Sequence, residues 1–524
     1  MSMFKHFGLA LLAAAISTPA MAGPVVQLAQ GKAEGVIENG VEAYLALPYA
    51  QPPEGERRWR APLPAKPWAG VRDAAHFGPA CYQADGGSGW GPYTAEFIAP
   101  PPFSEDCLTA NIWKPAGKTG KLPVLVFIHG GGFGGGGATV PIYDGAALAR
   151  RGILVVTIQY RVGVFGFLAH PALSAQSRLH SSGNYGLLDQ IEALKWIKAN
   201  IARFGGDAAN ITISGESAGA ASVSHLIVSP LAKGLFAKAI AFSGASMGVT
   251  VPSLREGEAV GLKLAQDMGR TTVEQLRAAP AAELVARTRA MPDASGKAPP
   301  LLYVPHVDGS VVRYDPTIGD RPIASKVPVM TGYNAAEMVD FSIDTPARFE
   351  QALRARYGAF ADRLLGLYPH ATPAQASASN LLLARDRYMS GALIWAKARK
   401  RVSGQTVFAY LYDHPYPAAP AGQPFGAFHT SQIPYIFGNL GLGGRQFSAK
   451  DTQVSRQWQD LILAFMRKGT PAGPDGIWPA ATPGPDTKAM IIGDHPGFAP
   501  VVSSPERFAA FRDYARQGGN LGLM

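Results

Sequence analysis

Two hydrophobic periods run along this chain, and they predict two kinds of element. Short unbroken apolar runs at 123–128 and 153–159 are typical of strands buried on both faces, whereas residues 187–203 repeat apolar side chains at helical spacing. Further elements are predicted as strands at 210–214, 237–242, 327–331, 406–412 and 490–492, and as a helix at 218–228. Because strands alternate with helices, we expect an α/β fold with a large, mostly parallel central sheet and helices on both faces.

Three regions depart from this alternation. Residues 26–47 alternate apolar and polar positions around Glu38-Asn39-Gly40, which predicts an antiparallel hairpin ahead of the main sheet. Residues 254–289 and 346–401 have helical patterns with no strong strand between them, which predicts helical insertions. No internal repeat or clear linker divides residues 23–524, so we expect them to form a single domain.

Residues 1–22 have the pattern of a cleavable export signal. Lys5 gives the positive start, an apolar run follows at 7–16, and Ala20-Met21-Ala22 is a small-x-small cleavage site. The apolar run is shorter than the ~20 residues that span a bilayer. We therefore expect a periplasmic or secreted protein without integral membrane association, an uncleaved N-terminal helix being the alternative.

The predicted compartment affects how the two cysteines are interpreted. In an oxidising compartment a pair such as Cys81 and Cys107 usually forms a disulfide, which would stabilise the fold by about 3–3.5 kcal/mol. Two buried free thiols are the alternative. Neither cysteine has a second Cys or His cluster beside it, so we expect no metal site.

Composition and charge narrow the classes of function. With 47% hydrophobic and 16% charged residues, the chain is ordinary for a globular protein. Its formal net charge of +10 raises nucleic acid, membrane surfaces and acidic substrates as partners. The densest basic cluster, at 397–401, lies in a helical pattern typical of a solvated face, so we expect no nucleic-acid partner.

A nucleophile elbow is predicted at 215–219, where the sequence reads Gly-Glu-Ser-Ala-Gly. The pattern alone is weak, because a second match stands at 244–248. Ser217 follows a predicted strand and opens a helical run, whereas Ser246 leads into Val-Thr-Val-Pro. The sequence therefore predicts Ser217 as a nucleophile, a structural glycine turn being the alternative.

A glycine-rich loop follows the strand predicted at 123–128. The run His129-Gly130-Gly131-Gly132-Phe133 exposes successive backbone N–H groups, which can stabilise an oxyanion during acyl transfer. A flexible linker and a phosphate cradle are alternatives, although the Gly-Lys-Ser/Thr ending of a phosphate cradle is missing. The elbow in the same chain favours the oxyanion hole.

A serine nucleophile of this kind also needs an acid and a histidine later in the chain. His414 and His429 stand out, because both follow the strand predicted at 406–412. The residue pattern alone does not choose between these two histidines.

Taken together, these motifs resemble the type-B carboxylesterases, the α/β-hydrolase family that includes cholinesterases and bacterial para-nitrobenzyl esterases. The resemblance extends over nearly all of the chain after residue 22. Its blocks are 58–62 (RWRAP), 104–108 (SEDCL), 129–133 (HGGGF), 160–163 (YRVG), 183–190 (GNYGLLDQ), 204–207 (FGGD), 215–219 (GESAG), 332–337 (GYNAAE) and 426–429 (GAFH).

The resemblance implies an α/β-hydrolase fold and assigns the remaining site residues. By it, Glu337 is the triad acid, His429 is the base and His414 is not catalytic. The implied oxyanion hole consists of the N–H groups of Gly131, Gly132 and Ala218. The implied structural pairs are the disulfide Cys81–Cys107 and the ion pairs Arg58–Glu105 and Arg161–Asp189.

Three positions depart from the family pattern. Gln432 stands where an acid usually lies three residues after the base, and Met338 stands where glycine usually follows the triad acid. Trp90 has a different spacing from Cys107 than the choline-binding tryptophan of cholinesterases. Specificity for choline esters therefore has no support.

We expect a carboxylesterase that cleaves a small-molecule ester through an acyl-enzyme and needs no cofactor. Trp90, Tyr93 and Phe133 are candidate substrate contacts, ordinary packing being the alternative. The positive charge, and bacterial relatives that cleave tricarballylic esters of fumonisin toxins, favour esters of anionic acids or xenobiotics. The alternatives are an amidase, a thioesterase or a carbamate hydrolase on the same triad, and a catalytically silent binding protein. The sequence indicates no oligomeric state.

Overall fold

The structure, a computed structural model, describes residues 23–244, 251–288, 301–317, 321–420, 422–473, 476–479 and 487–522. The predicted export signal at 1–22 and the second serine motif, with Ser246, lie outside the described residues.

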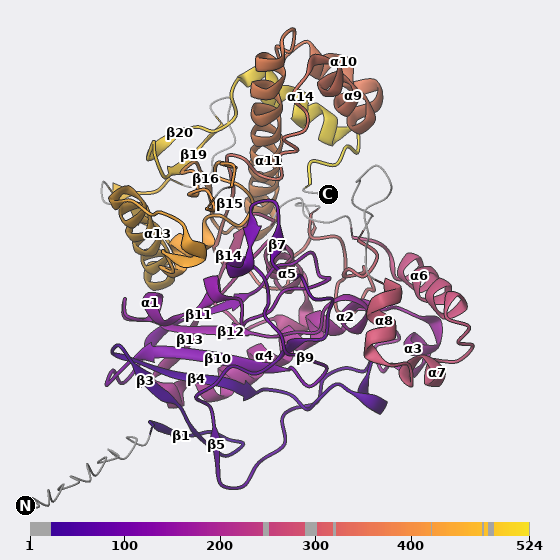
Figure 1. The fold of residues 1–524 in the computed structure, drawn as a ribbon, viewed down its shortest axis with the longest axis vertical. Coiled ribbons are helices and arrows are strands. Elements are labelled where there is room, and N and C mark those ends of the chain that lie inside the picture. Colours follow the sequence, from indigo (N-terminus) through magenta and orange to yellow (C-terminus); the bar gives the residue numbers. More distant parts are fainter. Residues whose placement is uncertain are drawn as a thin grey trace, which may run out of the picture.

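An eleven-stranded mixed sheet forms the centre of the fold, with the order β20-β19-β16-β15-β14-β13-β11-β12-β10-β4-β3 (Figure 1). Its strands are β3 (Val36–Glu38), β4 (Val41–Pro48), β10 (Thr109–Pro115), β11 (Leu122–Ile128), β12 (Leu154–Ile158), β13 (Gly206–Glu216), β14 (Lys238–Phe242), β15 (Val329–Asn334), β16 (Val407–Tyr412), β19 (Lys488–Ile492) and β20 (Gly497–Pro500). Neighbours from β12 to β19 run parallel, and the strands outside them pair antiparallel. The predicted mostly parallel sheet is thus confirmed.

The parallel strands are buried on both faces, because successive side chains of a strand point into opposite layers. In β11, Val124 and Val126 pack into one apolar layer, whereas Leu125 and Phe127 pack into the other. Helices cover both layers: α4 (Tyr185–Asn200), α5 (Ala218–Val228) and α11 (Pro373–Ser403) on the first, and α13 (Ala449–Lys468) on the second.

Both predicted helical insertions are present. The first contains α6 (Leu254–Asp267), α7 (Val273–Arg277) and α8 (Ala281–Thr288), and the second contains α9 (Pro346–Tyr357), α10 (Ala361–Leu365) and α11. In Figure 1 the first group lies at one side of the sheet, while α9 and α10 gather with α14 (Pro505–Arg516) around α11. The first insertion packs against Trp59, Phe165 and Tyr185 in one buried apolar cluster, and the second insertion shares another with α14.

The N-terminal strands differ from the prediction. The hairpin predicted over 26–47 is confined to β3 and β4, which add to the edge of the main sheet. β1 (Val25–Gln27) and β2 (Lys32–Glu34) instead pair with β5 (Val71–Asp73) in a separate three-stranded sheet. Alternating hydrophobicity indicates which face of a strand is buried, but it does not indicate the strand's partner, and for this reason the sequence did not separate the two sheets.

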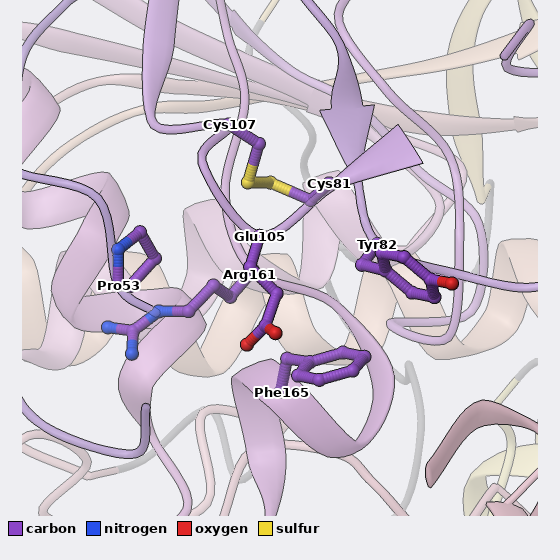
Figure 2. A pocket seen from close by; sticks show the side chains of 7 residues that line it. All are labelled: Pro53, Cys81, Tyr82, Glu105, Cys107, Arg161 and Phe165. Atoms are coloured by element: carbon purple, nitrogen blue, oxygen red, sulfur yellow. A yellow bond between two sulfur atoms is a disulfide. The ribbon is translucent and has the colours of Figure 1, made fainter. Parts of the chain in front are cut away.

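A disulfide joins Cys81 to Cys107, as predicted. Figure 2 shows it beside the side chains of Glu105, Arg161 and Phe165, with which it lines a small cavity. The cavity has a volume of about 10 Å³, which admits no more than a water molecule. The disulfide therefore belongs to the packed interior of the fold and not to a substrate pocket.

Two ion pairs with little exposure to solvent stabilise the chain near this disulfide. Arg58 Nη2 lies 2.5 Å from Glu105 Oε1, and Arg58 Nη1 also donates to the carbonyl oxygens of Arg277 and Ala279, by the end of α7. The second pair, Arg161 and Asp189, has an N–O distance of 2.7 Å and ties the chain after β12 to α4. These contacts agree with the structural role that the family resemblance implies.

We expect loss of the disulfide to destabilise the fold. Cys81→Ser combined with Cys107→Ser opens a loop with a sequence separation of 26, for which loop-closure entropy gives about 3–3.5 kcal/mol. Urea unfolding followed by circular dichroism should show a lower midpoint in the double variant than in the oxidised wild type. The reduced wild-type protein is the matched control and should unfold like the variant; a midpoint unchanged in both would contradict a stabilising disulfide.

Candidate active site

The candidate site lies where the carboxyl ends of neighbouring parallel strands meet. Glu216 ends β13, and Ser217 directly follows it as the N-cap of α5. Glu337 lies shortly after the end of β15, and His429 lies in the connection that follows β16. Because β13, β15 and β16 run parallel in one sheet, all three segments leave it at the same edge.

Ser217 has the backbone geometry of a nucleophile elbow. Its φ of 56° and ψ of −122° lie outside the regions that non-glycine residues usually adopt. The turn is held by the Ser217 N–H, which donates to the carbonyl oxygen of Phe242 at 3.0 Å on neighbouring β14. Ser217 is partly exposed, whereas Glu216 and Ala218 on either side are buried. The strained turn thus presents the serine to the surface of the site.

The glycine loop after β11 passes directly beside Ser217. A Cβ added to Gly130 would lie 3.0 Å from Ser217 Cβ and 2.8 Å from the Glu216 side chain, so no larger residue fits there. A Cβ added to Gly219 would lie 2.0 Å from the carbonyl oxygen of Ile128, which shows how closely α5 approaches the end of β11. Two glycines therefore let the predicted oxyanion-hole segments approach each other.

Glu337 and His429 are brought together by pairing between their loops. The Ala336 N–H donates to the carbonyl oxygen of Ala427 at 3.0 Å, and Ala336 and Phe428 form an isolated parallel bridge. His429 Nδ1 then forms a hydrogen bond with Glu337 Oε1. Both side chains are buried. The structure thus places the predicted acid against the predicted base.

The second oxygen of Glu337 is held by two further donors. Ser243 Oγ donates to Glu337 Oε2 at 2.9 Å, and the Asn334 backbone N–H donates to the same oxygen at 2.8 Å. Gln432, the position that departs from the family pattern, donates through Nε2 to Ser243 Oγ at 3.2 Å. The sequence pattern did not indicate Ser243 or Asn334, because these contacts form only when three strands assemble.

A second carboxylate faces the other ring nitrogen of His429. Glu216 Oε1 lies 3.3 Å from His429 Nε2, and it accepts a hydrogen bond from Thr430 Oγ1 at 2.7 Å. Sequence analysis missed both residues as parts of the site. A signal for Glu216 was present, since an acidic residue directly before Ser217, at the end of a strand buried on both faces, lies close to the site.

The two carboxylates change the protonation of the imidazole. Burial lowers the pKa of His429, but the charges of Glu337 and Glu216 and the hydrogen bond to Glu337 outweigh it and raise the pKa to about 9. Burial also raises the pKa of Glu216 to about 7, although His429 and Thr430 act in the opposite direction. With a pKa of about 9, His429 accepts a proton only in those molecules in which its ring is neutral, and their fraction increases as the pH rises toward 9.

His414, the other histidine considered from the sequence, lies between two different carboxylates. Its Nδ1 is 2.6 Å from Asp494 Oδ1, and its Nε2 is 3.0 Å from Asp451 Oδ1. Asp451 lies on α13 and Asp494 follows β19, so this histidine links the second helical layer to the sheet. Both of its ring nitrogens are therefore occupied by structural contacts.

The three candidate substrate contacts have different surroundings. Trp90 is 64% exposed and lies 5.6 Å from the ring of Tyr93 between ring centroids. Tyr93 packs edge-to-face on Phe428, and the charges of Glu216 and Glu337 add to burial in raising the pKa of its hydroxyl. Phe133 is 0% exposed and packs on Phe167 in the core, where it offers no surface to a ligand. Tyr93 and Trp90 thus remain candidate contacts, and Phe133 packs behind the glycine loop.

Comparison with known proteins gives consistent results. The sequence model of the carboxylesterase family matches residues 22–499. A fumonisin B1 esterase of Sphingopyxis macrogoltabida is 36% identical over 86% of this chain and 83% of its own length. A para-nitrobenzyl esterase of Bacillus subtilis is 33% identical over 88% and 93%, respectively. A solved structure named PNB esterase superposes with a TM-score of 0.74 at 32% identity, covering 89% of this chain and 95% of that one. The structural match confirms the predicted α/β-hydrolase fold.

Removing the charge of Glu216 should lower the pKa of His429. Glu216→Gln keeps the shape of the side chain but removes a negative charge next to Nε2, so we expect a decrease of about one pH unit. Titration of the His429 ring by NMR with ¹⁵N-labelled histidine measures this pKa directly. Glu192→Gln removes a carboxylate that pairs with Lys195 on α4 and is the matched control. Equal titration in the wild type and in Glu216→Gln would contradict the electrostatic role of Glu216.

Glycine at position 338 should stabilise the fold. Met338 has a φ of 46°, a conformation that costs a residue with a Cβ roughly 1–2 kcal/mol, and its side chain is 46% exposed. Met338→Gly relieves this strain but adds freedom to the unfolded chain, so we expect a net gain of up to about 1 kcal/mol. Met338→Ala keeps the Cβ and should give no comparable gain. A lower thermal midpoint for the glycine variant than for the wild type would contradict the strain.

Proposed function

The chain belongs to the carboxylesterase family, and from that premise we propose that it hydrolyses carboxylic esters with Ser217 as nucleophile, His429 as base and Glu337 as triad acid. The hydrogen bond between His429 Nδ1 and Glu337 Oε1, at the sheet edge where Ser217 stands, carries the proposal. A carboxylate at Nδ1 favours the imidazole tautomer that leaves Nε2 able to accept a proton.

In the acylation step, Ser217 Oγ attacks the ester carbonyl carbon while its proton passes to His429 Nε2. The carbonyl oxygen becomes an oxyanion, which the N–H groups of Gly131, Gly132 and Ala218 stabilise by roughly 3–4 kcal/mol for each donor. When the C–O bond to the leaving alcohol breaks, that alcohol takes the proton from Nε2. The product of this step is an ester between Ser217 and the acyl group.

In the deacylation step, water repeats the sequence. His429 Nε2 takes a proton from the water as its oxygen attacks the acyl carbon, and Ser217 Oγ regains that proton when it leaves. The imidazolium that forms in each step faces Glu337 on one side and Glu216, at 3.3 Å, on the other. Both carboxylates therefore stabilise the charge that develops on the base.

Charge near the reaction centre bears on the choice of substrate. The groups that raise the pKa of His429 are both carboxylates, which favours an ester that is uncharged close to its carbonyl. The net charge of +10 acts over a longer range and would favour the approach of anionic esters at low salt. We therefore propose that the substrate is uncharged close to its ester bond. Anionic groups on the substrate are accommodated only away from the bond that is cleaved.

Domain organisation and localisation follow as parts of the same proposal. Strands from Val36 to Pro500 join one sheet, which supports a single catalytic domain over 23–524. A disulfide persists mainly in oxidising compartments, and this supports export of the protein. Among the described helices, none has the length and apolar composition needed to cross a bilayer.

Ser217→Ala should abolish ester hydrolysis without unfolding the protein. Since the variant lacks the attacking oxygen, we expect kcat for para-nitrophenyl butyrate to fall at least about 10³-fold, with the circular dichroism spectrum unchanged. His429→Ala should cause a loss of similar size, because the base is removed.

His414→Ala is the matched control for the base. This variant also loses a buried imidazole, but one that contacts Asp451 and Asp494 instead of Glu337, so most of the turnover should remain. Two outcomes would speak against the proposal: near-normal turnover in Ser217→Ala, or equal losses in the two histidine variants.

A further inference from the structure

A chain of buried hydrogen bonds connects the loop of the base to the triad acid. Asn334 Nδ2 lies 2.6 Å from the carbonyl oxygen of Phe428 and 2.6 Å from Gln432 Oε1. Gln432 Nε2 lies 3.2 Å from Ser243 Oγ, which lies 2.9 Å from Glu337 Oε2. Asn334, Gln432, Ser243 and Glu337 are each 0% exposed. We refer to these four side chains as the Gln432 chain.

The direction of every hydrogen bond in the Gln432 chain is fixed at its Phe428 end. A backbone carbonyl can only accept, so Asn334 must turn its NH₂ group toward Phe428. The second proton of that group is then directed at Gln432, which must present its carbonyl oxygen Oε1 and therefore its NH₂ group to Ser243. Ser243 accepts from Gln432 and has one proton left, which it donates to Glu337.

Asn334 makes a third contact through the same NH₂ group, and its carbonyl oxygen is left without a partner. Its Nδ2 lies 3.3 Å from Ser431 Oγ, while its Oδ1 is buried without a hydrogen-bond partner. Turning the amide over would place Oδ1 against the acceptors of Phe428 and Gln432, which is worse than one unsatisfied oxygen. The orientation is therefore imposed by the surrounding acceptors.

We propose that Gln432 is a positioning residue for the triad, which directs the Ser243 proton onto Glu337 and so holds the triad acid in place against His429. This inference rests on the proposed function of Ser217, His429 and Glu337. The Gln432 chain closes into a ring of contacts, because Phe428 precedes His429 in the sequence and His429 binds Glu337. A shift of Gln432 is thus transmitted through the Ser243 hydroxyl to Glu337, which binds the base.

The amide at position 432 has a property that an acid lacks. An amide accepts at one atom and donates at the other, as the contacts of Asn334 and Ser243 require. An ionised carboxylate in the same place could only accept, so the Ser243 proton would turn toward it and away from Glu337. The added negative charge would also raise the pKa of His429 further.

Gln432→Glu is the primary test, because it changes the hydrogen-bonding polarity and leaves the size nearly unchanged. We expect kcat for para-nitrophenyl butyrate to fall about tenfold in the pH range in which the introduced carboxyl is ionised, while KM changes by less than about twofold. Since His429 accepts a proton only when neutral, its raised pKa should move the acid limb of the kcat profile to higher pH.

Gln432→Met and Ser243→Ala supply a double-mutant cycle. Gln432→Met removes both hydrogen bonds without adding charge, so kcat should fall without the shift of the acid limb to higher pH. In the Ser243→Ala background the same substitution should change kcat less than about twofold, because its effect acts through the Ser243 hydroxyl. If Gln432 only filled space, Gln432→Met would cause the same loss of kcat in both backgrounds. Urea unfolding of each variant identifies any variant that fails to fold.

The outcomes separate this inference from the proposed function. Two outcomes would overturn the role of Gln432 and leave the proposed function intact, provided that Ser217→Ala is inactive. One is a wild-type kcat with an unshifted acid limb in Gln432→Glu. The other is additive losses of kcat in the double-mutant cycle of Gln432→Met and Ser243→Ala. If Gln432→Met does not fold, the test of Gln432 rests on the direction in which the acid limb of the kcat profile shifts in Gln432→Glu. Turnover that persists in Ser217→Ala would overturn the proposed function instead.

Discussion

One buried imidazole between two buried carboxylates is the arrangement on which the candidate site depends. Glu337 binds Nδ1 of His429, and Glu216 lies 3.3 Å from Nε2. Placing two carboxylates in an apolar interior is costly unless each is paired and hydrogen-bonded. Thr430 supplies a donor to Glu216, and Ser243 and the backbone of Asn334 supply donors to Glu337. The polar residues around Glu216 and Glu337 are thus explained by the carboxylates that they stabilise.

The parallel strands of the sheet bring the residues of this arrangement together. Parallel strands end at one edge, so Ser217 after β13, Glu337 after β15 and His429 after β16 leave the sheet on the same side. Short backbone contacts then complete the site, such as the bridge between Ala336 and Phe428 and the close approach of Gly130 to Ser217. The helical insertions pack in two further buried apolar clusters, outside the two layers that cover the sheet. The site is therefore a property of strand order and of a few tight loops.

Local features of the site could be predicted from the sequence, and long-range ones could not. The strands and helix 218–228 were found because burial on two faces and helical spacing leave a periodic signal, and the elbow at Ser217 is defined by its immediate neighbours. The choice of Glu337 and His429 required a family resemblance, because their meeting depends on the pairing of loops far apart in sequence. In the sequence, Gln432 stood out only as a departure from the family pattern, which has an acid at this position. Its contact with Ser243 explains why an amide is accommodated there.

Covalent capture tests the central claim most directly, because a fluorophosphonate reacts with a serine only when a base activates it. After treatment and digestion, mass spectrometry should find one adduct, on the peptide that contains Ser217. The labelling rate should fall as the pH decreases below the raised pKa of His429, and His429→Ala should not be labelled. An adduct on Ser246, or a labelling rate that is unaffected by His429→Ala, would contradict an activated Ser217.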